Sequence, residues 1–450
     1  MKRRSLSVIP AFILTVLALG SCGNTTPAAS SGTTAQTTTT AAEQSMTEPS
    51  MTESSAAEQT TTEQAAVEGT SNEKTSDDTL SFEDRLISES LFSLGSTERF
   101  RKVFEKAKNG EEITVAYIGG SITEGYTVKP EECWAYLTHR WLCEKYPDAK
   151  INYVNAGLSG TPSTLGLIRC ERDVIEPCGE PDIVFVEFAV NDDSSAVTKE
   201  AYESLVRKLL LLDSAPAVSL IFMRTDNGYS CQDWQREVGY LYHLPMISVN
   251  DALSHAIDNG DMTWANYSND GAHPNPEGCK MIASMVEYML DAAAGDRETY
   301  REYEESAPID DVNAVVPIYG SDFVNMHLTD AAELEPVDAG EYTVTEALAA
   351  FPNAWTRKGG ENEGITFDME FDDLFMVYHC NKSKHYGTAE VYVDGELKTE
   401  VVSNAADGWS NPVPQLITRG EGKTSHTVEV KIKGDGEKVY FGILAFGFTD

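Results

Sequence analysis

Short apolar runs alternate with stretches of helical periodicity over the middle of the chain, from about residue 81 to residue 294. The runs are rich in Val, Ile and Phe, and most are followed by a turn and then by apolar residues spaced three or four apart. Alternation of this kind predicts parallel βαβ units with helices on both faces of one sheet. We expect strands at residues 113–118, 151–155, 183–188, 218–223 and 246–249.

The same region begins with an amphipathic pattern at residues 97–108, closed by Asn109-Gly110, which predicts a helix. The pattern changes after a charged segment at residues 298–311. Beyond it, residues 391–397 and 428–432 alternate between apolar and polar positions with a period of two, which indicates antiparallel strands. The dipeptides Asp394-Gly395 and Asp435-Gly436 favour two-residue hairpin turns.

These patterns predict an α/β fold class with two folded domains. Residues 81–300 are expected to form a three-layer α/β/α domain of flavodoxin-like topology, in which ligands bind at the carboxyl ends of the strands. Residues 312–450 are expected to form an antiparallel β-sandwich, the architecture of many carbohydrate-binding and accessory modules.

Residues 1–22 have the pattern of an export signal. Three basic residues precede an apolar run at residues 8–19, and the following Leu19-Gly20-Ser21-Cys22 resembles a bacterial lipobox. We expect cleavage before Cys22 and attachment of lipid to its thiol, because the apolar run is too short to span a bilayer well. A plain secretory peptide and a short membrane anchor are the alternatives.

Residues 23–80 are rich in Thr, Ser, Ala, Gln and Glu and contain almost no aromatic residue. Such a composition buries too little apolar surface to offset the loss of chain entropy on folding. We therefore expect a disordered tether, which after a lipidated cysteine would hold the folded domains at the surface of a bacterial cell envelope.

The formal net charge of −38 at pH 7 restricts the partners of the chain. Nucleic acids and anionic membranes bind clustered Lys and Arg, so we expect no nucleic-acid partner and no membrane contact beyond the lipid anchor. A neutral polymer fits this charge. Because no HExxH motif or second histidine cluster occurs, we also expect no metal and no other cofactor.

The cysteines do not predict a framework of disulfide bonds. Of the eight in the sequence, seven remain after Cys22, an odd number without metal-site spacing. A disulfide between Cys170 and Cys178 and a set of free buried thiols are the alternatives.

Four short motifs carry candidate chemistry. The first expected strand ends in Gly119-Gly120-Ser121, the second is followed by Gly157, and the third by Asn191, so all three lie where a parallel sheet builds its site. The fourth, Asp270-Gly271-Ala272-His273, combines a base with an acid three residues earlier. A carboxylate at this spacing can accept a hydrogen bond from one imidazole nitrogen, while the other nitrogen takes a proton from a serine hydroxyl.

In this order the four motifs resemble the SGNH (GDSL-type) hydrolase superfamily, and the resemblance covers roughly residues 110 to 293. Two positions depart from the common pattern, because Gly120 replaces the Asp of G-D-S and Ala189 replaces the Gly of G-x-N-D. The first departure occurs in relatives that carry Gly-Gly-Ser-Ile-Thr, and the second keeps a small residue. Neither departure changes the expected activity, but together they leave the subfamily unassigned.

The resemblance implies a serine esterase. Ser121 would be the nucleophile, His273 the general base and Asp270 the residue that orients it. The oxyanion of the tetrahedral intermediate would be bound by the backbone N–H groups of Ser121 and Gly157 and by the side-chain amide of Asn191.

Several aromatic residues lie near these motifs in the sequence. Trp264 and Tyr267 flank the Asp270–His273 loop and are our candidates for substrate binding. Further aromatic residues either stack on sugar rings or pack in a core, and the sequence leaves both open. They are Tyr126, Trp134, Trp355 and Trp409.

We expect a cell-surface carbohydrate acetylesterase, which removes O-acetyl groups from a polysaccharide or oligosaccharide such as xylan or mannan. A lipase, lysophospholipase or thioesterase of the same superfamily is one alternative, and an inactive carbohydrate-binding surface protein is another. The β-sandwich either binds sugar independently or completes the active site. The sequence indicates no oligomeric state.

Overall fold

The computed structural model describes residues 80–358, 364–406, 408–420, 422–433 and 439–450. The predicted signal sequence, the lipidation site at Cys22, the hairpin turn at Asp435-Gly436 and all but the last residue of the predicted tether lie outside these ranges. These features stay predictions. Within the described ranges, no helix combines the length and the apolar composition that a bilayer span requires.

The first half of the described chain forms a six-stranded sheet with the order β1-β6-β5-β4-β2-β3. All neighbouring strands are parallel except β1 and β6. The five expected strands correspond to β2 through β6, whereas β1 has only three residues, too few for a sequence pattern. The strands are β1 (Leu91–Ser93), β2 (Ile113–Gly119), β3 (Ile151–Gly157), β4 (Ile183–Glu187), β5 (Ala217–Phe222) and β6 (Met246–Ser248).

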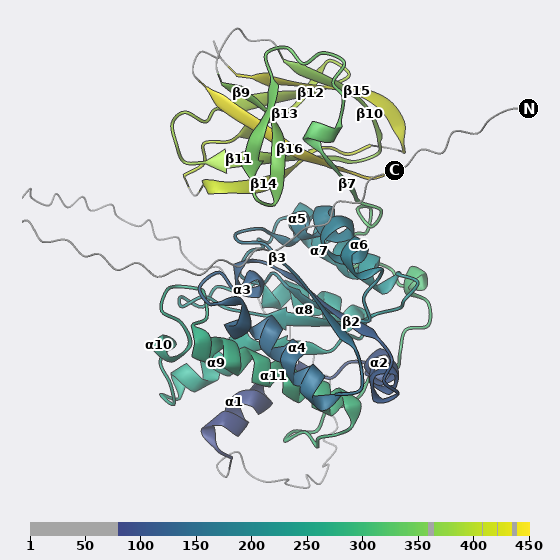
Figure 1. The fold of residues 1–450 in the computed structure, drawn as a ribbon, viewed down its shortest axis with the longest axis vertical. Coiled ribbons are helices and arrows are strands. Elements are labelled where there is room, and N and C mark those ends of the chain that lie inside the picture. Colours follow the sequence, from purple (N-terminus) through teal and green to yellow (C-terminus); the bar gives the residue numbers. More distant parts are fainter. Residues whose placement is uncertain (1–79, 359–363, 407, 421, 434–438) are drawn as a thin grey trace, which may run out of the picture. The chain divides into compact units, whose positions relative to one another are not determined.

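Helices cover both faces of this sheet (Figure 1), which confirms the predicted three-layer fold. One apolar core joins the sheet to α1 (Phe82–Ser90), α2 (Glu98–Lys108), α4 (Trp134–Lys145), α9 (Val249–Asp258) and α11 (Pro276–Ala294). The other joins it to α5 (Ser163–Cys170), α7 (Ala196–Leu210) and α8 (Gln232–Leu241). Shorter turns are α3 (Ser121–Glu124), η2 (Pro130–Glu132), η3 (Glu171–Ile175), α6 (Glu176–Cys178) and α10 (Trp264–Tyr267).

Helix α2 shows how the sequence pattern leads to structure. Its buried residues are Phe100, Val103, Phe104 and Ala107, spaced three and four apart so that they share one face. Gly110 follows the helix with a φ of 76°, a conformation that glycine adopts without steric cost. The helix predicted at residues 97–108 is confirmed.

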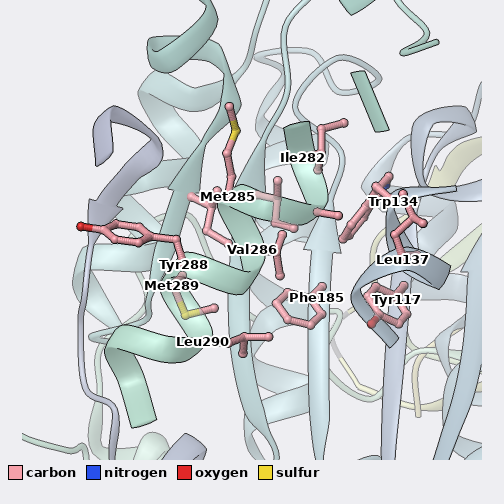
Figure 2. Close-up of a cluster of buried hydrophobic side chains, with 14 of the residues drawn as sticks. Tyr117, Trp134, Leu137, Phe185, Ile282, Met285, Val286, Tyr288, Met289 and Leu290 are labelled. Carbon is pink, nitrogen blue, oxygen red and sulfur yellow. The ribbon is translucent and has the colours of Figure 1, made fainter. Parts of the chain in front are cut away.

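Aromatic side chains pack among aliphatic ones in the core that α4 and α11 cover (Figure 2). The rings of Tyr117 and Phe185, from the central strands β2 and β4, stack with centroids 5.3 Å apart. Trp134 meets Tyr117 edge to face at 5.3 Å and is fully buried. Of the two roles left open for Trp134, core packing is therefore correct.

The order of the strands fixes where a site can form. Strand β2 lies between β3 and β4, so the chain crosses to one side of β2 and then returns to the other. At such a reversal, a crevice opens beyond the carboxyl ends of the strands. Ser121 directly follows β2, and Asn191 follows β4, which places both residues at this crevice.

The second half of the described chain forms two antiparallel sheets, which confirms the predicted β-sandwich. The four-stranded sheet consists of β10 (Ile365–Phe371), β15 (Thr424–Ile432), β12 (Thr388–Val393) and β13 (Glu396–Val402). The other contains β14 (Trp409–Thr418), β11 (Leu374–Asn381), β16 (Tyr440–Phe448), β9 (Phe351–Lys358) and β8 (Thr343–Leu348), with β7 (His327–Asp330) paired to β16. Two 3₁₀ turns, η4 (Val312–Ala314) and η5 (Ala331–Glu333), precede β8.

The hairpin between β12 and β13 turns at the predicted dipeptide. Asp394 and Gly395 both have positive φ, at 53° and 78°. Positive φ at both central residues is what a two-residue type I′ turn requires. The turn predicted at this dipeptide is confirmed.

The sandwich shares an apolar core with the α/β domain. Phe323, Phe351, Phe375 and Leu444 belong to the same buried cluster as the inner faces of α5 and α7. The two domains also make a polar contact, in which the Arg419 guanidinium of the sandwich pairs with Glu200 of α7. The two domains therefore contact each other through packed side chains.

Helix α7 also binds the segment that connects the domains. The buried carboxylate of Glu203 accepts hydrogen bonds from the backbone N–H groups of Ile318, Tyr319 and Gly320, at 3.0, 2.6 and 3.2 Å. One helix turn further on, Lys208 Nζ donates to Met326 O at 3.0 Å. These contacts fix the connecting segment along α7.

Candidate active site

A sharp turn at the end of β2 places Ser121 at the first position of α3. The two glycines before it are required by close contacts. A Cβ atom at Gly119 would lie 2.3 Å from Thr123 Oγ1, and one at Gly120 would lie 2.1 Å from Asn191 Oδ1. Glycine at these positions therefore allows the side chain of Asn191 to approach the turn that carries Ser121.

The structure brings Ser121, His273 and Asp270 together as the sequence predicts. His273 Nε2 lies 2.9 Å from Ser121 Oγ, and His273 Nδ1 lies 2.8 Å from Asp270 Oδ2. Both distances are those of hydrogen bonds. Ser121 is 7% exposed, so its hydroxyl is shielded yet within reach of the imidazole.

The loop that carries the acid and the base is held by its own polar groups. Asp270 Oδ1 accepts hydrogen bonds from the backbone N–H groups of Ala272 and His273, at 2.8 and 2.7 Å. Ser268 Oγ donates to His273 O at 2.5 Å. Directly after the loop, Asn275 caps the long helix α11 by accepting from the N–H groups of Glu277 and Gly278. The imidazole is thus positioned at the start of a rigid helix.

These hydrogen bonds also set the charge of Asp270. Burial alone would raise its pKa, but the N–H groups of Ala272 and His273 and the ring of His273 outweigh burial and lower the pKa to about 2. The carboxylate is therefore ionised at any pH at which the histidine can act as a base.

Three polar groups without an internal partner belong to residues that line one pocket, Ser121, Gly160 and Asn191. The side-chain amide of Asn191 makes no hydrogen bond to any described residue, although its Oδ1 is buried. The backbone N–H groups of Ser121 and Gly160 likewise donate to no acceptor within the described ranges. The N–H groups of Ser121 and Gly160 and the NH₂ group of Asn191 have no acceptor among the described residues, so all three can donate to an incoming oxyanion.

Gly157 was predicted as an oxyanion donor, and the structure contradicts this. Its N–H donates to Asn155 Oδ1 at 2.9 Å, so the group is already used. A Cβ atom at Gly157 would lie 2.1 Å from Glu124 N, which shows that this glycine lets α3 pack against β3. Gly160, three residues further along the same loop, lines the pocket instead. The sequence Gly157-Leu158-Ser159-Gly160 contains a second glycine, and this residue could have been chosen as the oxyanion donor.

Ser121 and His273 open into a pocket of about 350 Å³, a size typical of small-molecule sites. Loops after β2, β3 and β4 and the His273 loop form most of its wall. The sandwich contributes one residue, Trp409. The lining residues are Ser121, Tyr126, Ser159, Gly160, Val190, Asn191, Thr225, Ala272, His273 and Trp409.

Comparison with known proteins agrees with this geometry. A model of the GDSL-like lipase/acylhydrolase family matches residues 117–281. The crystal structure of a two-domain esterase active on acetylated mannans is 28% identical, covers 81% of this chain and 98% of its own, and has a TM-score of 0.70. The two-domain esterase co-crystallized with mannopentaose is 27% identical, with the same coverage of 81% and 98% and a TM-score of 0.70. No curated protein matches this sequence.

This chain is a carboxylic ester hydrolase. The family match spans the segment that contains Ser121, Asn191, Asp270 and His273. The structural match extends over the sandwich as well, since it covers 81% of the chain. The esterase therefore resembles its solved relatives in both domains.

The aromatic candidates near the triad loop do not reach the pocket of the esterase. Tyr267 was predicted to bind substrate, which is wrong because its side chain is fully buried in the core. Trp264, the other candidate, is absent from the pocket wall, and its indole N–H donates to Asp270 O at 2.6 Å. It supports the loop rather than contacting the pocket.

Two other aromatic residues do line the pocket. Tyr126 is 65% exposed, and its ring centroid lies 5.2 Å from that of His273. Trp409 is 53% exposed and packs on the backbone of Gly160, where an added Cβ would lie 2.8 Å from the indole. Trp355, by contrast, packs against the core of the sandwich. Of the two tryptophans left open in the sandwich, Trp409 is the one at the active site.

The thiols and the metal-ligating residues of the esterase form no further centre within the described ranges. Cys170 is a free thiol that is completely buried, so the Cys170–Cys178 disulfide considered above is not formed. No group of three His, Cys, Asp or Glu side chains among the described residues is arranged to hold a metal ion.

Two carboxyl groups next to the site are buried. Burial raises the pKa of Glu187 to about 7 and that of Asp192 to about 8, although both accept hydrogen bonds that oppose the change. Glu187 accepts from Thr123 Oγ1 at 2.8 Å. Asp192, the neighbour of Asn191, accepts from Ser163 N at 2.7 Å and from Gln235 Nε2 at 2.9 Å. Both groups help to fix the loops around Ser121.

We expect Asp192→Asn to stabilise the esterase near pH 8 and to change its stability little near pH 4. The unfolded chain loses this proton near the ordinary pKa of 3.8, whereas the folded chain keeps it up to about pH 8. The free energy of unfolding therefore falls as the pH rises through this window. Asparagine stays neutral, and its amide can donate to Gln235 Oε1, which has no partner in the structure. The expected gain near pH 8 is about 3–5 kcal/mol.

Urea unfolding at both pH values measures this gain. Asp193→Asn is the matched control, because hydrogen bonds from Ser195 outweigh burial and lower the pKa of this neighbouring carboxyl group. The control should give no gain near pH 8. An equal gain for Asp192→Asn at both pH values would contradict the expected titration.

Proposed function

We propose that the esterase removes O-acetyl groups from a polysaccharide through an acyl-enzyme, with acetylated mannan as the favoured substrate. The observation that carries the proposal is the hydrogen-bonded series Ser121, His273 and Asp270, of which Ser121 and His273 line a pocket whose wall includes Trp409 of the sandwich. Support for the substrate comes from the similarity to a two-domain esterase active on acetylated mannans.

In the first step, Ser121 Oγ attacks the acetyl carbonyl while its proton moves to His273 Nε2, 2.9 Å away. Asp270 stabilises the imidazolium and keeps its Nδ1–H oriented. Negative charge develops on the former carbonyl oxygen, where the N–H groups of Ser121 and Gly160 and the amide of Asn191 would bind it.

Collapse of this intermediate breaks the bond between the carbonyl carbon and the sugar oxygen. His273 gives its proton to the departing sugar hydroxyl, and acetyl-Ser121 remains. Water then attacks this ester with His273 again as the base, and acetate leaves with Ser121 restored.

A carbohydrate chain fits the surroundings of the pocket. Tyr126 and Trp409 present exposed aromatic faces, which pack well on the apolar faces of sugar rings. The net charge of −38 is compatible with a neutral polymer. The proposal also includes export: a lipid on Cys22 and the tether of residues 23–80 would hold the enzyme at the cell surface, where such polymers are met.

Acetate release tests the proposal. We expect the full chain to release acetate from acetylated mannan and acetylated xylan and to prefer 4-nitrophenyl acetate to the octanoate by about tenfold or more in kcat/KM. Trp409→Ala should raise KM for acetylated mannan about tenfold, because an aromatic contact with a sugar ring is lost. Its kcat/KM for 4-nitrophenyl acetate should stay within about twofold of the wild-type value.

Tyr240→Ala is the matched control, since Tyr240 is 50% exposed and does not line the pocket. It should leave both substrates unaffected. Turnover of long-chain esters without acetate release from either polymer would refute the proposal in favour of a lipase or thioesterase. An equal loss on both substrates in Trp409→Ala would refute the role given to Trp409.

A further inference from the structure

Arg169, near the end of α5, is a charged residue in the interior of the α/β domain. Its side chain is 1% exposed. Nη1 donates to Ala156 O at 2.7 Å and to Asp173 Oδ2 at 3.1 Å, and Nη2 donates to Gly119 O at 3.0 Å. Removing an ion pair from water carries a large desolvation cost, and apolar residues of similar size often stabilise a fold as well or better.

The two carbonyl groups that Arg169 binds belong to the ends of β2 and β3. Gly119 is the last residue of β2 and lies two residues before Ser121. Ala156 lies at the end of β3, and its carbonyl shares a peptide plane with the N–H of Gly157, from which the loop runs on to Gly160. A guanidinium is a planar fork with fixed donor directions, so it sets the spacing of the two carbonyl groups it binds.

Further hydrogen bonds join the same two loops. Leu158 N donates to Gly119 O at 3.0 Å, and Asn155 Nδ2 donates to Thr123 O at 2.7 Å. On the exposed side, Glu124 Oε2 accepts from Ser159 N at 2.8 Å. Arg169 is the buried member of this set, and it contacts both strands at once.

The charge of Arg169 is largely balanced where it stands. Asp173 accepts from Arg169, and it also accepts from Arg172 Nε at 2.6 Å. Asp173 lies in η3, a π-helical turn that directly follows α5 and returns its side chain toward Arg169. A balanced charge contributes little field at Ser121, so the fixed geometry of the guanidinium is the larger effect.

We propose that Arg169 is a positioning residue of the oxyanion hole, which holds the loop of Ser121 and the loop of Gly160 at the spacing that lets both N–H groups reach one oxygen atom. The inference rests on the proposed acyl-enzyme function. Catalytic constellations lose rate when their donors shift by a fraction of an ångström, so the consequence appears in the chemical step.

Arg169→Lys tests this, because lysine keeps the charge and loses the fork. We expect kcat for 4-nitrophenyl acetate to fall about tenfold or more while KM changes less than about threefold. The rate at which a fluorophosphonate labels Ser121 should fall by a similar factor, and the inhibition constant of a boronic acid, which forms a tetrahedral adduct with serine, should rise in parallel.

Arg207→Lys is the matched control. Arg207 is also buried and also donates to a backbone carbonyl, Val315 O at 3.1 Å, but it lies on α7 away from the pocket. Its variant should lose thermal stability without change in labelling rate or boronic acid affinity. Wild-type labelling and kcat in a folded Arg169→Lys protein, or a change in KM alone, would overturn the inference.

Asp173→Ala decides the matter if Arg169→Lys does not fold. Asp173 is one-quarter exposed, and its loss frees the guanidinium without removing it. We expect a fall in labelling rate of about threefold or more, and a wild-type rate would overturn the inference. Labelling depends on Ser121, on the His273 and Asp270 side chains that activate it, and on the oxyanion donors, but not on a polymer substrate. Labelled wild-type protein without acetate release would therefore refute the proposed substrate and leave the role of Arg169 measurable.

Discussion

Ser121→Ala is expected to lower ester hydrolysis by a factor of about 10⁴ or more while the protein stays folded. Among the residues that the structure describes, the hydroxyl of Ser121 is the only group hydrogen-bonded to His273 Nε2, at 2.9 Å, and it can form an acyl-enzyme. Alanine keeps the Cβ atom of this side chain and loses the oxygen, so no group that could form an acyl-enzyme remains next to the imidazole. The measurement is kcat/KM for 4-nitrophenyl acetate together with acetate release from acetylated mannan.

Thr123→Ser is a suitable companion, because it changes a hydroxyl residue of the same turn that is fully buried and bonded to Glu187. This variant should keep most of the activity. If Ser121→Ala retained more than about one per cent of wild-type turnover in a preparation free of contaminating esterase, Ser121 would not be the nucleophile.

Asp270→Asn is expected to lower kcat about 10³-fold with little change in KM. The carboxylate now accepts from His273 Nδ1 at 2.8 Å and from two backbone N–H groups. An asparagine amide that keeps the backbone bonds would turn its NH₂ group toward Nδ1, which favours the wrong imidazole tautomer. The position is half exposed, so water partly replaces the lost acceptor, and we expect a smaller loss than for Ser121→Ala.

The pH profile gives a second measurement of the same residue. Because the pKa of Asp270 is lowered to about 2, its own titration should not appear in the kcat/KM profile of the wild type above about pH 4. Asp261→Asn, at a surface carboxylate paired with Arg85, should reproduce the wild-type profile and rate. An unchanged kcat in Asp270→Asn would show that His273 is oriented by other groups.

The sequence predicts the strands and the triad because both produce patterns within short segments of the chain. Buried parallel strands are largely apolar, and β2 and β4 are buried over seven and five consecutive residues with one polar or charged residue each, Thr114 and Glu187. Asp270 and His273 lie in one short loop, so their pairing is a matter of spacing in the sequence. Ser121 and Asn191 follow neighbouring strands, and the parallel order of the sheet brings them together.

The errors arise where contacts depend on the path of a loop. Gly157 ends β3 and faces α3, whereas the chain needs three further residues to reach the pocket at Gly160. Tyr267 and Trp264 share the four-residue turn α10, and one points into the core while the other supports the triad loop. A local pattern does not distinguish these directions.

The sequence identifies Trp409 as a candidate for sugar binding, but it does not predict that this residue lies at the active-site pocket. It lies 288 residues after Ser121 in the sequence. Its position at the pocket depends on how β14 packs beside the loop of Gly160, which no periodicity within either segment encodes. The alternative that the sandwich completes the active site is therefore the one that the pocket geometry favours.

The apolar core shared by the sandwich and the inner faces of α5 and α7 limits how this enzyme can evolve by exchange of modules. A binding module joined by a free linker can be replaced by another without consequence for its catalytic neighbour. Here a replacement would leave the partners of Phe323, Phe351 and Phe375 facing water. The α/β domain and the sandwich must therefore evolve together. Substrate preference then belongs to the two domains jointly and not to either one alone.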